Sequence, residues 1–308
     1  MPSPISAASL PPLVEMAHGA GGRAMGRMIE AVFARHFDNE WLRAGNDGAV
    51  LPGLLPNERL VMATDSHVVS PLFFPGGDIG CLAAQGTIND VAVMGARPLW
   101  LAAAFILEEG LPFAVLDRVV ASMAAAARQA GVPVVTGDTK VVERGKGDGI
   151  YINSSGVGVI APGVELSGRN CLPGDAVLLS GYLGDHGIAI VATREGLNLE
   201  VPVASDAAPL GALTRSVLAA APQTRCFRDP TRGGLASTLN ELARQSGTCM
   251  LVDEALVPVR DAVRGASDLL GYDVYHLANE GKMVAVVAAE QAEAALAAMR
   301  QSPYGADA

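Results

Sequence analysis

The chain has 308 residues, half of them hydrophobic, with 35 glycines and a net charge of −10. This length suits two ordinary domains or one large domain with a sizeable core. The acidic balance argues against sequence-independent nucleic-acid binding, which needs a basic face. The longest apolar run, 99–107, is too short to span a bilayer, and the first residues lack the features of a signal peptide. We therefore expect a cytoplasmic protein with no nucleic-acid or membrane partner.

Helical and extended patterns alternate in the first half, after a tail at 1–17 that we expect to be flexible. In chain order they predict a helix at 22–37, a strand at 60–64 ending at Asp65, a helix at 78–94, a strand at 99–107, a helix at 111–130 closed by Gly131, a strand at 132–136 running into Gly137-Asp138, and a strand at 149–160.

The second half shows the same style, after a Pro- and Gly-rich linker at 161–174. The patterns predict strands at 176–180 and 283–288 and helices at 187–195, 233–245 and 291–299. Such alternation indicates an α/β or α+β protein in two domains, an N-terminal one at 18–160 and a C-terminal one at 175–308.

Four aspartates in the first half stand in short polar breaks near apolar stretches: Asp47, Asp65, Asp90 and Asp138. Mg²⁺ takes a few carboxylates together with phosphate oxygens, so this set favours a magnesium–nucleotide site. Lys140 follows the last aspartate by two residues. Taken singly, an aspartate after a strand is more often a cap or turn residue.

Two glycine-containing segments precede predicted helices. In His18–Arg23 the glycines would let backbone N–H groups approach a phosphate at a helix N-terminus, although a flexible loop is the commoner meaning. In Asp229–Gly234, Arg232 could bind a phosphate or carboxylate, and the alternative is a turn that begins at a proline.

Other polar residues give weaker signals. Within Asn279–Lys282, Glu280 could act as a general base, or the segment could be an ordinary hairpin connection. Gly184–Gly187 is more typical of a helix cap than of a binding turn, and the remaining histidines receive no role. The four cysteines are widely spaced, which indicates mostly buried reduced thiols rather than a zinc site.

Several of these segments together resemble one family. They are His18–Gly22, Thr64–Gly80 with its Pro-Leu-Phe-Phe-Pro-Gly-Gly-Asp-Ile-Gly stretch, Gly86–Asp90, Met94–Ala96, Thr136–Val142, Gly184–Gly187, Asp229–Gly234 and Ala278–Lys282. On them the chain resembles the HypE hydrogenase maturation factors of the PurM-like ATP-dependent superfamily, from about His18 onward.

The resemblance implies an N-terminal α/β domain that pairs with a second subunit into a dimeric, barrel-like core, and a C-terminal α+β domain. It implies that ATP converts a thiocarboxamide on a C-terminal cysteine into a thiocyanate, which supplies the cyanide ligand of [NiFe] hydrogenases. HypF would supply the carbamoyl group, and a HypC–HypD complex would accept the cyanide.

The resemblance also assigns residues. Asp65, Asp90 and Asp138 would hold Mg²⁺; Asp47 is a weaker candidate, because relatives often carry two adjacent acidic residues at Asn46-Asp47. Lys140 would contact the phosphates or the activated oxygen, Glu280 would remove the amide protons, and Arg232 would orient the phosphate or the tail. The remaining residues expected at the nucleotide are Gly19, Gly21, Gly22, Thr64, Asn89 and Thr139.

Family members end in a tail closing with Pro-Arg-Ile-Cys, whereas this sequence stops at Ala308. We therefore expect the acceptor cysteine to be absent from the chain, whose C-terminal domain would be shortened. Selenophosphate synthetase and aminoimidazole ribonucleotide synthetase are alternatives within the superfamily, and the former would need an early cysteine, whereas none precedes Cys81. A non-catalytic nucleotide-binding scaffold for maturation partners is an alternative of another class.

Overall fold

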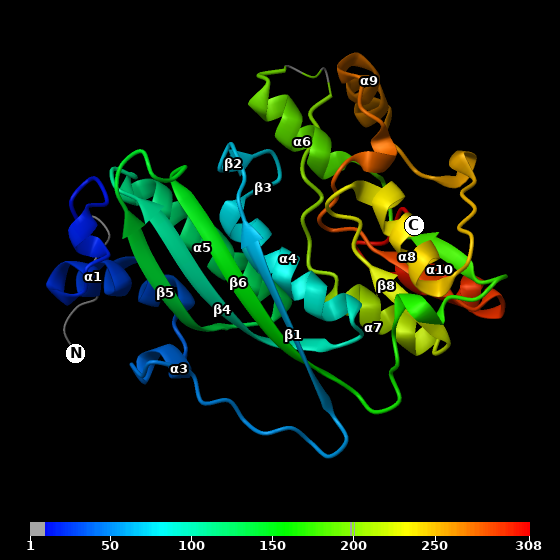
Figure 1. Cartoon of the computed structure of the whole chain (residues 1–308), viewed down its shortest axis with the longest axis horizontal. Coiled ribbons are helices and arrows are strands. Elements are labelled where there is room, and N and C mark those ends of the chain that lie inside the picture. Colours follow the sequence, from blue (N-terminus) through cyan, green and yellow to red (C-terminus); the bar gives the residue numbers. More distant parts are fainter. Residues whose placement is uncertain (1–9, 198, 200) are drawn as a thin grey trace.

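The computed structural model describes residues 10–197, 199 and 201–308. The two halves of the chain form two domains side by side (Figure 1). The N-terminal half contains η2 (Met16–His18), α1 (Gly22–Met28), η3 (Ile29–Ala34), α2 (Arg35–Phe37), α3 (Glu40–Arg43), β1 (Arg59–His67), β2 (Phe73–Phe74), β3 (Gly77–Asp78), α4 (Ile79–Val93), β4 (Arg97–Glu108), α5 (Phe113–Ala130), β5 (Val134–Val142) and β6 (Ile150–Ile160).

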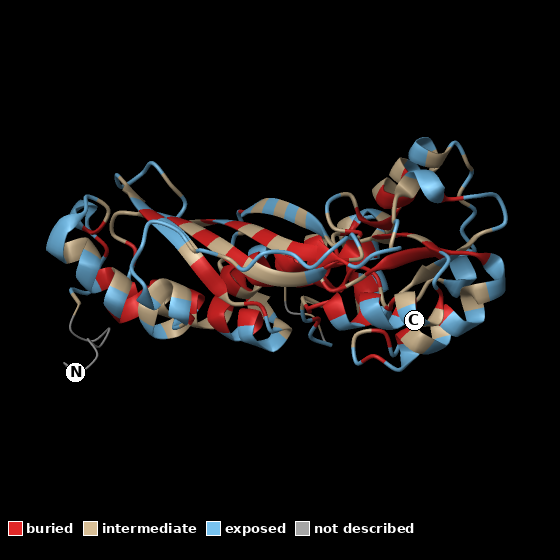
Figure 2. Cartoon of the chain, turned by 90° about the horizontal axis from the view of Figure 1, so that it is seen from below, coloured by how far each residue is buried: buried red, intermediate tan, exposed pale blue. Residues whose placement is uncertain are grey.

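The larger sheet has the strand order β1-β6-β4-β5. The β1–β6 and β6–β4 pairs are antiparallel, and β4 and β5 are parallel, joined by the crossover helix α5. Helices α4 and α5 cover one face, against which Leu101, Phe105 and Ile152 are buried. Burial alternates along the strands, as Figure 2 shows, because successive side chains point to opposite faces. Within this single chain the sheet is open and does not close into a barrel.

The other face of this sheet carries exposed apolar side chains. Leu60, Met62 and Ile106 are 60%, 72% and 42% exposed. Large apolar side chains gathered on one uncovered sheet face are typical of an interaction surface.

Helix α4 of the N-terminal domain packs against both domains. Asp78 caps its N-terminus, because the Oδ1 atom accepts hydrogen bonds from the backbone N–H groups of Gly80 and Cys81 at 2.8 and 3.0 Å. The helix is buried on nearly all sides, since the sheet lies on one side and α7 of the second half on another.

The C-terminal half contains η4 (Gly168–Asn170), β7 (Ala176–Leu179), α6 (Asp185–Arg194), α7 (Gly211–Ala220), β8 (Thr224–Arg228), α8 (Gly234–Ser246), η5 (Glu254–Leu256), α9 (Asp261–Leu270), η6 (Val274–His276), β9 (Val284–Val287), η7 (Ala289–Gln291) and α10 (Ala292–Arg300). Its sheet is antiparallel, in the order β7-β9-β8. The central strand β9 is fully buried: Ala285 and Val287 pack with residues of α7 and α10, and Val284 packs with residues of α8.

Most of the predicted helices and strands are confirmed to within a few residues. Two strands are longer than predicted, because β1 continues past Asp65 to His67 and β5 continues past Asp138 to Val142. Both aspartates therefore lie within strands rather than in breaks. Helices α7 and α9 and strand β8 fall in stretches where the patterns predicted no element.

The N-terminal tail was predicted to be flexible over 1–17, and residues 1–9 lie outside the described residues. In the described part, the chain is attached to the domain at Leu13 and Val14, and the flexibility of the remainder stays a prediction. Val14 is 1% exposed, its N–H donates to the carbonyl of Leu111 at 2.8 Å, and Leu13 forms a β-bridge with Pro112. In the described ranges, no helix combines the length and apolar character needed to cross a membrane.

The predicted state of the cysteines is confirmed in part, since all four are free. Cys171 and Cys226 are buried and Cys81 is half-buried, as expected. Cys249 is exposed in the irregular segment after α8.

Candidate active site

A cleft of about 680 Å³ lies between the two domains, and we call it the interdomain cleft. The end of β1 and one side of α4 form the N-terminal wall; α6 and the segments 229–232 and 272–280 form the C-terminal wall. Five of the residues predicted for the site line it: Thr64, Asp65, Asp90, Arg232 and Glu280. Residues more than 200 positions apart in sequence thus meet at one cavity.

Glu280 is held through its backbone. Its N–H donates to Oδ1 of Asp206 at 3.1 Å, and its carbonyl accepts from Nδ2 of Asn89 at 3.0 Å. Asn89 also donates to the carbonyl of Ala208 at 2.9 Å, and its Oδ1 accepts from the N–H of Leu210 at 2.8 Å. The Asn89 side chain is fully buried, and its three hydrogen bonds to the protein fasten α4 to the segment that carries Glu280, which differs from the expected nucleotide contact.

The residue after Glu280 must be a glycine for steric reasons. A Cβ atom on Gly281 would lie 1.9 Å from the carbonyl oxygen of Asp206, much closer than two atoms can approach. The glycine therefore lets the Glu280 segment pack tightly against the Asp206 loop.

Carboxyl groups in the cleft repel one another. Burial, followed by repulsion from Asp229 and Asp65, raises the pKa of Asp90 to about 7. Burial is also the main cause that raises the pKa of Asp229. The pKa of Glu280 is raised well above its ordinary range, chiefly by burial and then by repulsion from Asp206. A divalent cation bound among these groups would relieve the repulsion, so the donor chemistry fits Mg²⁺.

Two buried histidines line the same cleft. His67 is 6% exposed, and its Nε2 lies 3.7 Å from Oδ2 of Asp65 without a hydrogen-bond partner. His186 has Nδ1 2.8 Å from Oγ of Ser205 and Nε2 3.9 Å from Oε1 of Glu280, and burial lowers its pKa. Sequence reasoning gave neither histidine a role: for the segment 184–187 a helix cap was favoured over a binding turn, and Ser205 and Asp206 carried no motif.

A second group of predicted residues lies at strand β5 and the glycine segment before α1, and we call it the β5 group. A Cβ atom on Gly19 would lie 2.6 Å from the backbone nitrogen of Val141, so the glycine segment runs directly beside β5. Lys140 and Asp138 form an ion pair at 3.3 Å with both side chains more than half exposed, whereas Thr139 is buried on the helix side. Gly21 and Gly22 have positive φ values of 81° and 73° and are exposed at the start of α1.

The β5 group and the interdomain cleft are separated within one chain. Asp65 is on the helix-covered face of the sheet, and Asp138 is on the open face, since the register pairs Asp138 with Ala104, Asn153 and Ser66 across the sheet. Strands β6 and β4 lie between them, a span of about 14 Å. One chain therefore does not gather Asp65, Asp90 and Asp138. Among the described residues, no three His, Cys, Asp or Glu side chains form a metal-binding group, and Asp47 is exposed away from the cleft lining.

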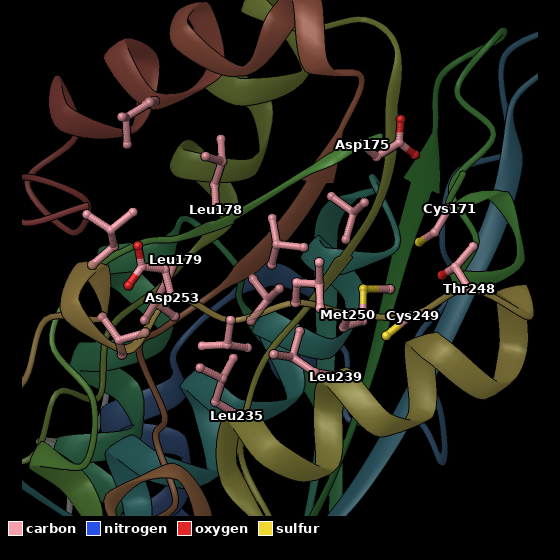
Figure 3. A pocket seen from close by; sticks show the side chains of 18 of the residues that line it. Cys171, Asp175, Leu178, Leu179, Leu235, Leu239, Thr248, Cys249, Met250 and Asp253 are labelled. Carbon is pink, nitrogen blue, oxygen red and sulfur yellow. The ribbon is translucent and has the colours of Figure 1, made fainter. Parts of the chain in front are cut away.

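The C-terminal domain contains a further cavity of about 580 Å³ (Figure 3). Leu178, Leu179, Leu235, Leu239 and Met250 form much of its wall, with the thiols of Cys171 and Cys249 near one end. Its mainly apolar lining contrasts with the acidic interdomain cleft and does not suit a polyphosphate.

Comparisons with known proteins agree with this arrangement. Residues 45–160 match the family model of the AIR synthase related protein N-terminal domain, and residues 173–307 match that of the C-terminal domain. The carbamoyl dehydratase HypE of Azotobacter vinelandii is 61% identical over 295 residues, which are 96% of this chain and 86% of that protein.

Two solved structures are also similar. A crystal structure of hydrogenase maturation protein HypE in complex with ATP superimposes with a TM-score of 0.92 at 50% identity, over 95% of this chain and 87% of that one. A HypE–HypF complex matches with a TM-score of 0.80 at 49% identity, over 89% of this chain and 88% of that one.

Proposed function

The chain belongs to the AIR synthase related family and, within it, to the HypE carbamoyl dehydratases, and we propose that it dehydrates a cysteine thiocarboxamide to a thiocyanate at the expense of ATP. The thiocyanate carbon and nitrogen would become a cyanide ligand in [NiFe] hydrogenase maturation. The observation that carries the proposal is the acidic interdomain cleft, into which Asn89 and Asp206 hold Glu280.

ATP is needed because the oxygen of a primary amide is a poor leaving group. Transfer of the γ-phosphoryl group to that oxygen releases ADP and makes the oxygen part of a phosphate, which leaves easily. The C–O bond then breaks, both N–H bonds break, and the nitrogen becomes that of the nitrile. The two protons must be taken by groups of the protein or by the departing phosphate.

In the interdomain cleft, Glu280 is the proposed base for these protons, because its carboxyl group lies on the C-terminal wall, is only 15% exposed and is held in place through its backbone by Asn89 and Asp206. Asp65 and Asp90 on the N-terminal wall would hold Mg²⁺ together with phosphate oxygens. Mg²⁺ is usually bound by one or two carboxylates plus phosphates and water, so a pair of aspartates is sufficient. The ion would neutralise charge on the transferring phosphoryl group. Arg232, exposed at the rim, would orient the phosphate or the tail.

The β5 group would complete the site from a second subunit. Its proposed members at the nucleotide are Gly19, Gly21, Gly22, Asp138, Thr139 and Lys140, with the metal-binding role of Asp138 included. A homodimer formed through the open sheet face would bury Leu60, Met62 and Ile106 and enclose Asp138 and Lys140, which share that face. We place the domains of each subunit at 18–160 and 175–308, with 161–174 as the linker.

The carbamoyl group must come from a partner. A HypE–HypF complex has been solved for a relative, which supports HypF as the donor for this chain. A HypC–HypD complex is the proposed acceptor of the cyano group.

The experiment uses an added cysteine, because none of the four native cysteines lines the interdomain cleft. A Pro-Arg-Ile-Cys segment is fused to the chain, and the same segment is offered separately as a peptide. Each is S-carbamoylated by HypF with carbamoyl phosphate, or chemically by cyanate, and mass spectrometry follows a gain of about 43 Da and then an ATP-dependent loss of about 18 Da, the mass of water.

The loss of water on either carrier supports the dehydratase. If Mg–ATP binds but the carbamoyl group persists on both carriers without ATP turnover, the chain is a nucleotide-binding scaffold instead. Chemical carbamoylation separates a failure of the donor partner from a failure of the dehydration itself.

A further inference from the structure

Dehydration of the thiocarboxamide removes two protons, whereas the proposed site has one carboxylate as the base. Both hydrogens leave the same nitrogen, and the oxygen leaves with the phosphoryl group, so the products are thiocyanate, ADP, hydrogen phosphate and one net proton. A carboxylate holds one proton at a time. The proposed function makes Glu280 the base for both N–H bonds, so Glu280 passes on the first proton before it removes the second, and the second proton can leave with the phosphate.

One side chain on the wall of the cleft is placed to receive that proton. His186 lies on the first turn of α6 with its Nε2 3.9 Å from Oε1 of Glu280, and the ring is fixed edge-on against Phe74 at 5.6 Å between centroids. Catalytic hydrogen bonds are often long before the substrate binds and tighten in the complex.

The opposite side of the same ring leads out of the cleft. Nδ1 of His186 is 2.8 Å from Oγ of Ser205, and Ser205 lines a different cavity of about 890 Å³. Asp206 and Lys282 line that second cavity as well, and their side chains form an ion pair at 3.3 Å. The histidine thus lies between Glu280 in the interdomain cleft and Ser205, a residue that lines the second cavity.

We propose that His186 and Ser205 form a proton relay that carries a proton from Glu280 in the interdomain cleft to the cavity at Asp206 and Lys282. This deepens the proposed function and depends on it. In the resting state Nδ1–H donates to Oγ of Ser205, and the lone pair of Nε2 faces Glu280. The protonated Glu280 gives its proton to Nε2, and Nδ1 releases its proton toward Ser205, which leaves the ring protonated at Nε2. A 180° flip of the ring between turnovers restores the first arrangement without returning the proton to the cleft.

The surroundings of the histidine suit this role. Burial in the wall keeps the ring neutral at rest, so that Nε2 is free to accept. The charged groups that face the pair are the carboxylates of Asp206 on the relay side, of Asp229 on the same wall and of Asp65 and Asp90 across the cleft, together with the ammonium of Lys282. These carboxylates favour the transient imidazolium, while burial opposes its persistence.

The test compares replacements of one ring. His186→Gln keeps an amide near the Nε2 position, which can orient Glu280 but cannot relay a proton. In single-turnover experiments on the S-carbamoylated, tail-bearing chain we expect His186→Gln and His186→Ala to dehydrate at least about 100-fold more slowly, with unchanged Mg–ATP affinity. Ser205→Ala should be slower by about tenfold.

Two readouts separate a relay from a structural role. Added imidazole should restore part of the rate of His186→Ala. In His186→Gln the rate should rise with pH over the range where wild type is flat, because hydroxide replaces the relay. His36→Gln, at an ion pair with Asp117 on the far side of the N-terminal domain, is the matched control and should keep the wild-type rate.

The outcomes are distinct. Wild-type rates in His186→Gln, with no response of His186→Ala to imidazole, would overturn the relay while leaving the dehydratase intact. No loss of water from the wild type itself would count against the proposed function and remove the reaction that the relay serves.

Discussion

Replacement of Asn89 by alanine should weaken both the fold and the active site. The Asn89 side chain makes three buried hydrogen bonds, to the backbone groups of Ala208, Leu210 and Glu280. Alanine leaves these groups unpaired, and each unsatisfied buried group costs roughly 1 kcal/mol or more, so the free energy of unfolding should fall by about 3 kcal/mol. The dehydration rate should fall as well, because the carbonyl of Glu280 loses its anchor on α4.

Urea unfolding followed by circular dichroism measures the first effect, with single-turnover dehydration as the second readout. Asn240→Ala is the matched control, since Asn240 is exposed on α8 and donates one hydrogen bond within its helix, to Ala236. That variant should stay within about 0.5 kcal/mol of the wild type. A loss below about 1 kcal/mol in Asn89→Ala would show that the domains are not held together by this side chain.

Three further results are expected. In metal-free buffer the raised pKa of Asp90 contributes stability to the folded chain, and this contribution is complete at pH values below 3.8, the ordinary pKa of the group. The contribution is lost as the pH rises through about 7. Thermal melts of Asp90→Asn should therefore change less with pH over that range than those of the wild type, and parallel curves would argue against the shift. Asp138→Asn should abolish Mg–ATP binding while leaving the melting temperature unchanged, because the side chain is 58% exposed; calorimetry showing unchanged affinity would remove Asp138 from the metal site. Lys140→Ala should bind ATP but lose turnover in the tail-bearing chain, and wild-type turnover would exclude the proposed contact with the phosphates.

Sequence patterns predicted the helices whose ends are marked by capping residues next to them in the chain. Helix α4 has a capping aspartate, and α5 ends at Gly131 in the left-handed conformation, so both were predicted closely. The ends of β1 and β5 were misjudged because Asp65 and Asp138 are polar. Pairing with β6 and β4 keeps these residues in the sheet, and sequence periodicity does not register such long-range pairing.

The site was predictable to the extent that its residues stand in motifs. Asp65, Asp90 and Glu280 do, and the cleft brings them together. Ser205 and Asp206 come from an irregular segment, and their part emerges only where that segment packs against Glu280 and His186. The separation of Asp138 from the cleft follows from the register of the sheet, which the local sequence does not reveal.

Asp138 and Lys140 share a sheet face with exposed apolar side chains, so a partner that covers the whole of this face encloses the two charged residues together with Leu60 and Met62. Under the proposed dimer, assembly and completion of the nucleotide site are a single event, and the specific activity should drop when the protein is diluted. Complementation follows too. A mixture of Glu280→Gln and Lys140→Ala chains, each inactive alone, would regain about a quarter of the wild-type sites, because half of the randomly formed dimers are mixed and each has one intact site.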